Sequence, residues 1–115
     1  MRSESGDLER ELRAILGAAR AEFLAALPER IAQIDALLGD LERGGDVATL
    51  AALRAETHRI AGLCGSIGLD PLAREGTRAE EVLRPLALGT APAESAALGR
   101  ARDAVLAVRA GLVMA

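Results

Sequence analysis

Residues 53–68 of this 115-residue chain read LRAETHRIAGLCGSIG, a stretch with helical periodicity around a single histidine, His58. Neighbours on one face of a helix lie three, four and seven positions apart. Leu53 and Ile60 therefore share one face, which we expect to pack into a core. The positions nearest His58 on the opposite face hold small residues and one arginine, namely Ala51, Arg54, Ala55, Ala61, Gly62 and Gly65.

The two glycines on the histidine face are a costly choice for a helix. Glycine in a helix interior costs ~1 kcal/mol relative to alanine. Gly62 and Gly65 both lie beside His58, so the space around the ring is itself useful. We predict that His58 faces solvent and that something large must reach it. Glu56 lies close to the apolar face, so either its carboxylate reaches water at a bundle edge or the helix is rotated from this assignment.

The remaining sequence favours an all-α protein. Half of the residues are apolar and only one, Phe23, is aromatic, so the core must be aliphatic. Leu, Ala, Glu and Arg dominate, and all are good helix formers. Apolar spacing predicts helices over residues 7–19, from Phe23 or Pro28 to residue 43, 47–67, 71–87 and 93–112. Asp46 and Asp70 are the expected N-caps of the third and fourth helices.

Short connections between these helices favour antiparallel neighbours. We therefore expect an antiparallel up-down four-helix bundle with an additional N-terminal helix packed on one end or side. Residues 1–6 are polar and expected to be disordered, and residues 7–115 form one domain.

Charge and composition exclude several classes of function. The net charge is −3 and no basic run is present, which argues against nucleic acid as a partner. No stretch approaches the ~18 apolar residues that span a membrane. A polar N-terminus and a single cysteine fit a cytoplasmic protein.

Four interpretations of His58 compete. A buried structural histidine conflicts with its polar face, and an incidental surface histidine leaves the cleared surroundings unexplained. A metal site lacks partners, because Cys64 lies ~120° around the helix by the 3.6-residue period. The fourth interpretation is a nucleophile that carries a phosphoryl group. No glycine-rich phosphate loop or associated lysine is present, so the chain is expected to be a carrier rather than an enzyme.

Residues 58–72, HRIAGLCGSIGLDPL, resemble the histidine phosphotransfer (HPt) domain of bacterial phosphorelays. That family has an apolar residue two positions after the histidine, glycines at four and ten, and leucine at fourteen. Ile60, Gly62, Gly68 and Leu72 match these positions. Residues 23–31 also resemble the helix that precedes the histidine helix in the family.

The resemblance implies that His58 is phosphorylated, on Nε2, within a four-helix bundle. It implies two protein partners, a histidine kinase and a response-regulator receiver domain whose aspartate and Mg²⁺ perform the transfer. No cofactor is expected in this chain. The receiver would dock over the small residues Ala55, Ala61, Gly62 and Gly65. Members of the family are often monomers, although a spare apolar face on the first or second helix leaves dimerisation open.

The chain departs from the family at one position. A lysine three residues after the histidine commonly contacts the phosphoryl group, and here that residue is Ala61. Arg54 and Arg59 are candidate replacements. Glu80, twenty-two residues after His58, matches the Glu or Gln that bonds the imidazole Nδ1 in the family and so fixes its tautomer. The missing lysine is also the best support for an alternative function, an interaction module that binds receivers or a kinase without carrying phosphate.

Overall fold

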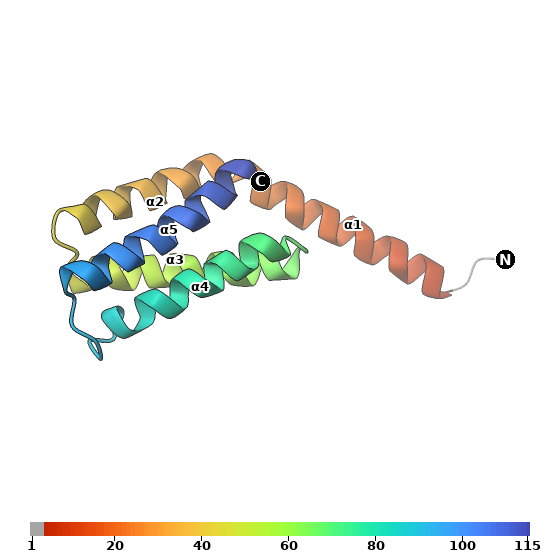
Figure 1. Ribbon diagram of the computed structural model, residues 1–115. Coiled ribbons are helices and arrows are strands. Elements are labelled where there is room, and N and C mark those ends of the chain that lie inside the picture. Colours follow the sequence, from red (N-terminus) through yellow and green to blue (C-terminus); the bar gives the residue numbers. More distant parts are fainter. Residues whose placement is uncertain (1–3) are drawn as a thin grey trace.

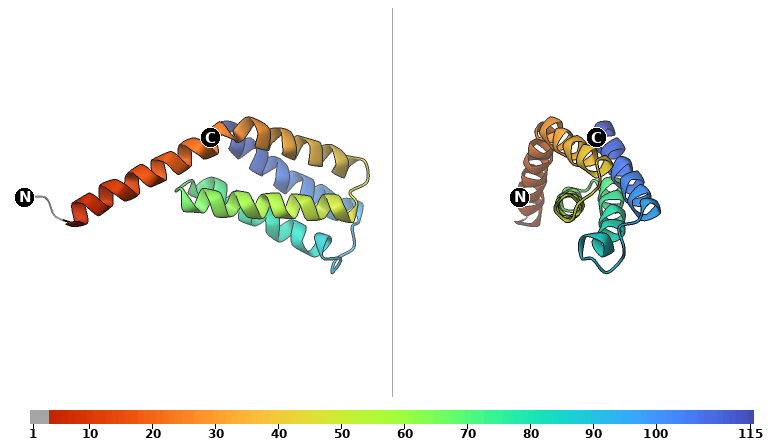
Figure 2. Two further views of the ribbon diagram at one scale, coloured as in Figure 1. Left: turned by 180° about the vertical axis from the view of Figure 1, so that it is seen from behind. Right: turned by 90° about the vertical axis from the view of Figure 1, so that its left-hand side faces the viewer.

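The computed structural model describes residues 4–115, and this part of the chain is entirely helical apart from its connections. The helices are α1 (Glu4–Ala25), α2 (Leu27–Glu42), α3 (Val47–Ser66), α4 (Asp70–Ala87) and α5 (Ser95–Met114). Helices α2 to α5 run up and down around one core, each beside the next, and α5 returns to lie against α2 (Figures 1 and 2). The all-α prediction and the four-helix bundle are confirmed.

The N-terminal helix differs from expectation in length and position. It ends at Ala25 rather than residue 19, so Phe23 belongs to α1 and not to the helix that follows. Residues 4–6, expected to be disordered, form its first turn, and residues 1–3 lie outside the described residues. Pro28 lies in the first turn of α2, where a proline needs no backbone donor, so the second helix does begin there.

Helix α1 projects from one end of the bundle and packs against it only near its own C-terminus (Figure 1). Phe23 is buried there, and Arg20 donates a hydrogen bond from Nη2 to the Ile67 carbonyl oxygen at 2.8 Å. The expectation that this helix packs on one end of the bundle therefore holds for its last turns, while the rest extends away.

Local capping explains where α3 begins. The Asp46 carboxylate accepts hydrogen bonds from the Thr49 backbone N–H and hydroxyl, both at 2.8 Å. These bonds lower the pKa of the Asp46 carboxyl below its usual value. The second expected cap is wrong, because Asp70 is already the first residue of α4 and the preceding Leu69 makes no side-chain cap.

The core is aliphatic, and α3 and α4 approach each other closely within it. Leu53 and Ile60 are fully buried, as the helix periodicity predicts. A Cβ atom built on Gly76 of α4 would lie 3.0 Å from the Ala61 nitrogen and 3.1 Å from the Thr57 carbonyl oxygen. These distances are shorter than most real Cβ contacts and the atoms met are backbone atoms, so a side chain at this position would push the two helices apart. The close approach brings the next turn of α4 against the histidine face of α3.

Candidate functional site

His58 lies in the middle of α3 with 76% of its side chain exposed. The opposite face of the helix points into the core, so the amphipathic pattern of α3 alone turns the imidazole outward. Nothing lies within 4 Å of where a Cβ atom would stand on Gly62 or Gly65. The surface beside the ring, on its C-terminal side, is therefore open.

Glu80 of α4 faces the imidazole. Its Oε1 atom lies 3.5 Å from His58 Nδ1 and 3.8 Å from Arg54 Nε. The carboxylate is 21% exposed, so water screens these contacts only in part. A carboxylate at Nδ1 favours the tautomer that carries a proton there, which leaves Nε2 with a free lone pair.

These three side chains border a surface hollow of about 310 Å³. Its lining combines polar atoms from His58, Arg54 and Glu80 with small and apolar side chains on both helices. The full lining is Ala51, Arg54, Ala55, His58, Glu80, Ala87 and Leu88. Ala87 and Leu88 were not anticipated from the sequence, although they follow Glu80 at the seven- and eight-residue spacing of one helix face.

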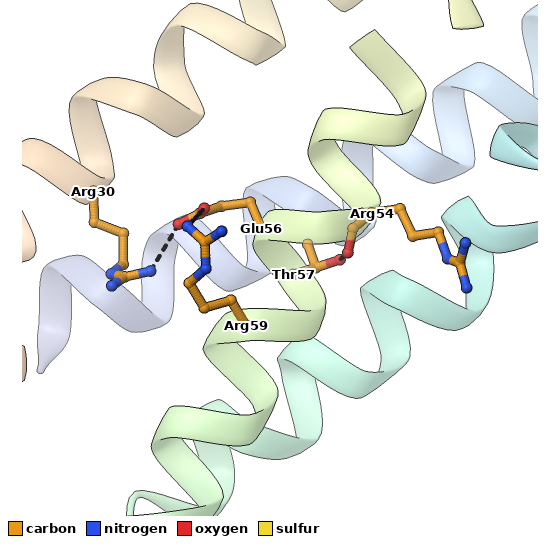
Figure 3. A network of polar contacts seen from close by, with 5 residues as sticks. All are labelled: Arg30, Arg54, Glu56, Thr57 and Arg59. Atoms are coloured by element: carbon orange, nitrogen blue, oxygen red, sulfur yellow. Dashed lines mark hydrogen bonds and ion pairs between the residues drawn. The ribbon is translucent and has the colours of Figure 1, made fainter. Parts of the chain in front are cut away.

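A second charged cluster lies on the other side of α3. Glu56 is only 5% exposed. Its Oε1 atom accepts a hydrogen bond from Arg30 Nη1 of α2 at 2.8 Å, and its Oε2 atom accepts one from Arg59 Nη1 at 3.2 Å (Figure 3). Neither expectation for Glu56 was right, since the carboxylate does not reach water and the core-facing residues of α3 show no rotation.

The two candidate arginines are therefore separated by the fold. Arg59 turns toward buried Glu56, whereas Arg54 extends on the opposite side of α3 toward α4 (Figure 3). Only Arg54 shares the hollow with His58. Periodicity places Arg54 on the face of the histidine, whereas Arg59 was a candidate only because it is adjacent in sequence. Neither observation contains information about Arg30, which pairs with Glu56 from twenty-six residues away.

The four predicted partner-binding residues differ in their exposure. Ala55, Gly62 and Gly65 are exposed around His58, whereas Ala61 is half-buried where α3 meets Gly76 of α4. The first three are therefore open to an approaching molecule, whereas Ala61 lies at the contact between the two helices.

Other groups offer little chemistry in the described residues. Cys64 is fully buried, and burial raises the pKa of its thiol, so it lacks the thiolate character of a reactive cysteine. Within residues 4–115 no cluster of three potential metal ligands is found. None of the helices described there is long and apolar enough to cross a membrane.

The structure thus defines a helical bundle that presents one exposed histidine with a carboxylate behind it. A sequence profile of the Hpt domain family matches residues 18–111, and the chain belongs to this family. It is a histidine phosphotransfer module of two-component signalling, a class of phosphocarriers rather than kinases. No significant match to the chain was found among curated proteins or among solved structures.

Proposed function

We propose that this chain is a phosphorelay intermediate that receives a phosphoryl group on His58 and passes it to a response-regulator receiver domain. The donor is a histidine kinase or the phosphoaspartate of another receiver. The observation that carries the proposal is the exposed imidazole whose Nδ1 lies 3.5 Å from Glu80, because this arrangement leaves Nε2 as the nucleophile.

The nucleophile that this chain supplies for the transfer is a neutral imidazole. The Nε2 lone pair attacks phosphorus of the aspartyl phosphate, the bond between phosphorus and the acyl oxygen breaks, and aspartate leaves as a carboxylate. The ring then carries the phosphoryl group on Nε2 and a proton on Nδ1. Glu80 stabilises the positive charge of this ring, and the reverse reaction returns the phosphoryl group to the next aspartate. Mg²⁺ bound by the receiver would neutralise the charge on the transferring oxygens.

Arg54 is the residue that we assign to the phosphoryl group in place of the family lysine. It lines the same hollow as His58, and its Nε atom lies 3.8 Å from the carboxylate that also faces the ring. A guanidinium can give two parallel hydrogen bonds to phosphoryl oxygens. Arg59 is not assigned this role, since buried Glu56 holds it on the other side of α3.

The partner is proposed to dock on the open surface around the histidine. Ala55, Gly62 and Gly65 leave room for a receiver to bring its aspartate close to Nε2. Kinases and receivers of this type work in the bacterial cytoplasm, so this is the compartment that we propose.

The proposal can be tested with phosphoramidate, a small phosphoryl donor, and ³¹P NMR. The wild-type protein should give a base-stable, acid-labile phosphohistidine signal, and His58→Gln should give none. The matched control is the double variant His58→Gln/Gln33→His, which moves the single histidine to an exposed position of α2, away from Glu80 and Arg54, and should give no signal. A wild-type protein that binds a receiver but never becomes phosphorylated, by this donor or by a phosphorylated receiver, would instead support the interaction module that the absence of lysine at Ala61 favours.

A further inference from the structure

The first two thirds of α1 carry a stripe of large apolar side chains that nothing in the described chain covers. Leu8, Leu12, Ile15 and Leu16 are 58%, 52%, 59% and 47% exposed. Residues 8–16 belong to the part of α1 that extends beyond the bundle (Figure 2). A single helix of this length is marginally stable in water, and a contiguous apolar patch of this kind marks an interaction surface.

The exposed stripe continues a face of α1 that is already used for packing. Ala19 and Phe23 follow Ile15 at intervals of four residues, and both pack against the core of the bundle. Leu8, Leu12, Ile15 and Ala19 are spaced by four, three and four residues, the spacing of a seam between two paired helices. The bundle covers the C-terminal end of this seam and leaves the N-terminal end open.

The charges along α1 favour an antiparallel partner helix of the same sequence. Residues 4–11 hold four acidic side chains and one arginine, whereas residues 12–20 hold two arginines and no acid. Two copies side by side in the same direction would place like charges together. Two copies in opposite directions place the acidic half of each beside the basic half of the other, and opposite charges attract.

The position of the α2–α5 bundle at one end of α1 also favours an antiparallel pair of α1 helices. A parallel pair would bring both bundles to the same end, where the seam at Ala19 and Phe23 is already covered. An antiparallel pair places the bundles at opposite ends and leaves residues 8–16 of each helix free to meet.

We propose that a second copy of this chain covers the stripe, so that the protein is a twofold dimer built by antiparallel packing of two α1 helices. The axis passes near Leu12, and Leu8 of each copy packs against Leu16 of the other. A hollow of about 320 Å³ at the base of α1, bordered by Phe23 and by Leu63, receives the beginning of the other copy's α1. Leu63 is 40% exposed and extends the apolar surface onto the bundle. Because the interface is isologous, it closes at two copies.

The first test is the mass of the full chain in solution, measured by size exclusion with light scattering. The wild type should have twice the 11.9 kDa chain mass, and Leu12→Glu should halve the measured mass. The matched control is Ala14→Glu, which adds the same charge to an exposed position of α1 outside the stripe and should remain a dimer. Because Leu12 touches no core residue, the α2–α5 bundle should unfold at the same temperature in both variants. A monomeric wild type, or a dimeric Leu12→Glu, overturns the proposal.

The second test is the direction of the pair, read by disulfide formation between engineered cysteines. The native Cys64 is fully buried and should not interfere. A mixture of Leu8→Cys and Leu16→Cys proteins should oxidise to a linked heterodimer, while each protein alone should link poorly. Efficient linkage of Leu8→Cys to itself would show a parallel pair and contradict the proposal.

Discussion

Helix α3 carries a carboxylate–arginine cluster on each side, and the two clusters differ in almost every physical respect. On one side, Glu56 is buried and held by Arg30 and Arg59 at hydrogen-bond distance. On the other side, Glu80 is partly exposed and lies 3.5 to 3.8 Å from His58 and Arg54. In the first cluster every charged group already has its partner within the protein. The second cluster leaves the Nε2 atom of His58 and the guanidinium of Arg54 available to a partner.

The difference shows how the same residue types serve structure or chemistry according to burial. A buried carboxylate needs its cations, because an uncompensated charge in the core is costly. Arg30 is committed to this role, and its guanidinium also stacks over Phe23 with its carbon 5.6 Å from the ring centre. A carboxylate at the surface can exchange partners cheaply, which suits a site where a phosphoryl group arrives and leaves.

The largest expected effect is on stability, from removing the buried carboxylate. Glu56→Ala leaves Arg30 without its partner in a largely buried position and should lower the free energy of unfolding by about 3–5 kcal/mol. Glu80→Ala should cost at most about 1 kcal/mol, because its contacts are longer and partly exposed. Urea denaturation followed by circular dichroism measures both. Equal losses in the two variants would contradict the distinction between the clusters.

The next effect concerns the two glycines that flank the site. Gly76→Leu must push against backbone atoms of α3 and should destabilise the bundle by about 1–3 kcal/mol. Gly62→Leu enters open space and should leave the unfolding temperature nearly unchanged while blocking receiver docking. Thermal unfolding and a phosphotransfer assay with a receiver separate the two outcomes. Normal transfer by Gly62→Leu would refute the argument that the cleared face serves a partner.

A smaller effect distinguishes the two arginines that flank His58 in sequence. Arg54→Ala should slow phosphorylation of His58 by phosphoramidate about tenfold, since a hydrogen bond to a charged group contributes roughly 1.5 kcal/mol or more. Arg59→Ala should change this rate less than twofold, because the Arg59 side chain faces Glu56. Initial phosphorylation rates from ³¹P NMR compare the two variants. A larger loss of rate in Arg59→Ala than in Arg54→Ala would place the phosphoryl group on the other side of α3.

The smallest expected effect concerns the Asp46 N-cap of α3, the helix on which both clusters lie. Because hydrogen bonds from Thr49 lower the Asp46 pKa below its ordinary 3.8, the capping stabilisation is present above pH 3.8. It is lost as the pH falls through the lowered pKa. Asp46→Ala should therefore melt at a lower temperature than wild type at neutral pH, and this difference should shrink below pH 3.8. A difference in melting temperature between wild type and Asp46→Ala that grows in acid would contradict a lowered Asp46 pKa. Because the cap acts at the start of α3, its loss should affect the Glu56 cluster and the Glu80 cluster equally.

The local features of this fold could be predicted from the sequence. The burial of Leu53 and Ile60, the exposure of His58 and the cap at Asp46 all follow from spacing or from one residue's own chemistry. The helix start at Pro28 was one of two alternatives that the sequence left open. The proximity of Glu80 to the histidine was reached through a family resemblance rather than through periodicity.

Only the tertiary structure decided which side chains meet across helices. The pairing of Arg30 with Glu56, the half-burial of Ala61 beside Gly76 and the outward course of α1 depend on how helices rotate and cross. A helical pattern specifies which face is apolar, but its neighbours and distances are set by packing that involves the whole chain. The sequence by itself therefore determined that a histidine faces outward from a helical bundle. The folded structure decided that Glu80 joins Arg54 at this surface and that Glu56 holds Arg59 away from it, because a rotation of one helix by a few tens of degrees would exchange their surroundings.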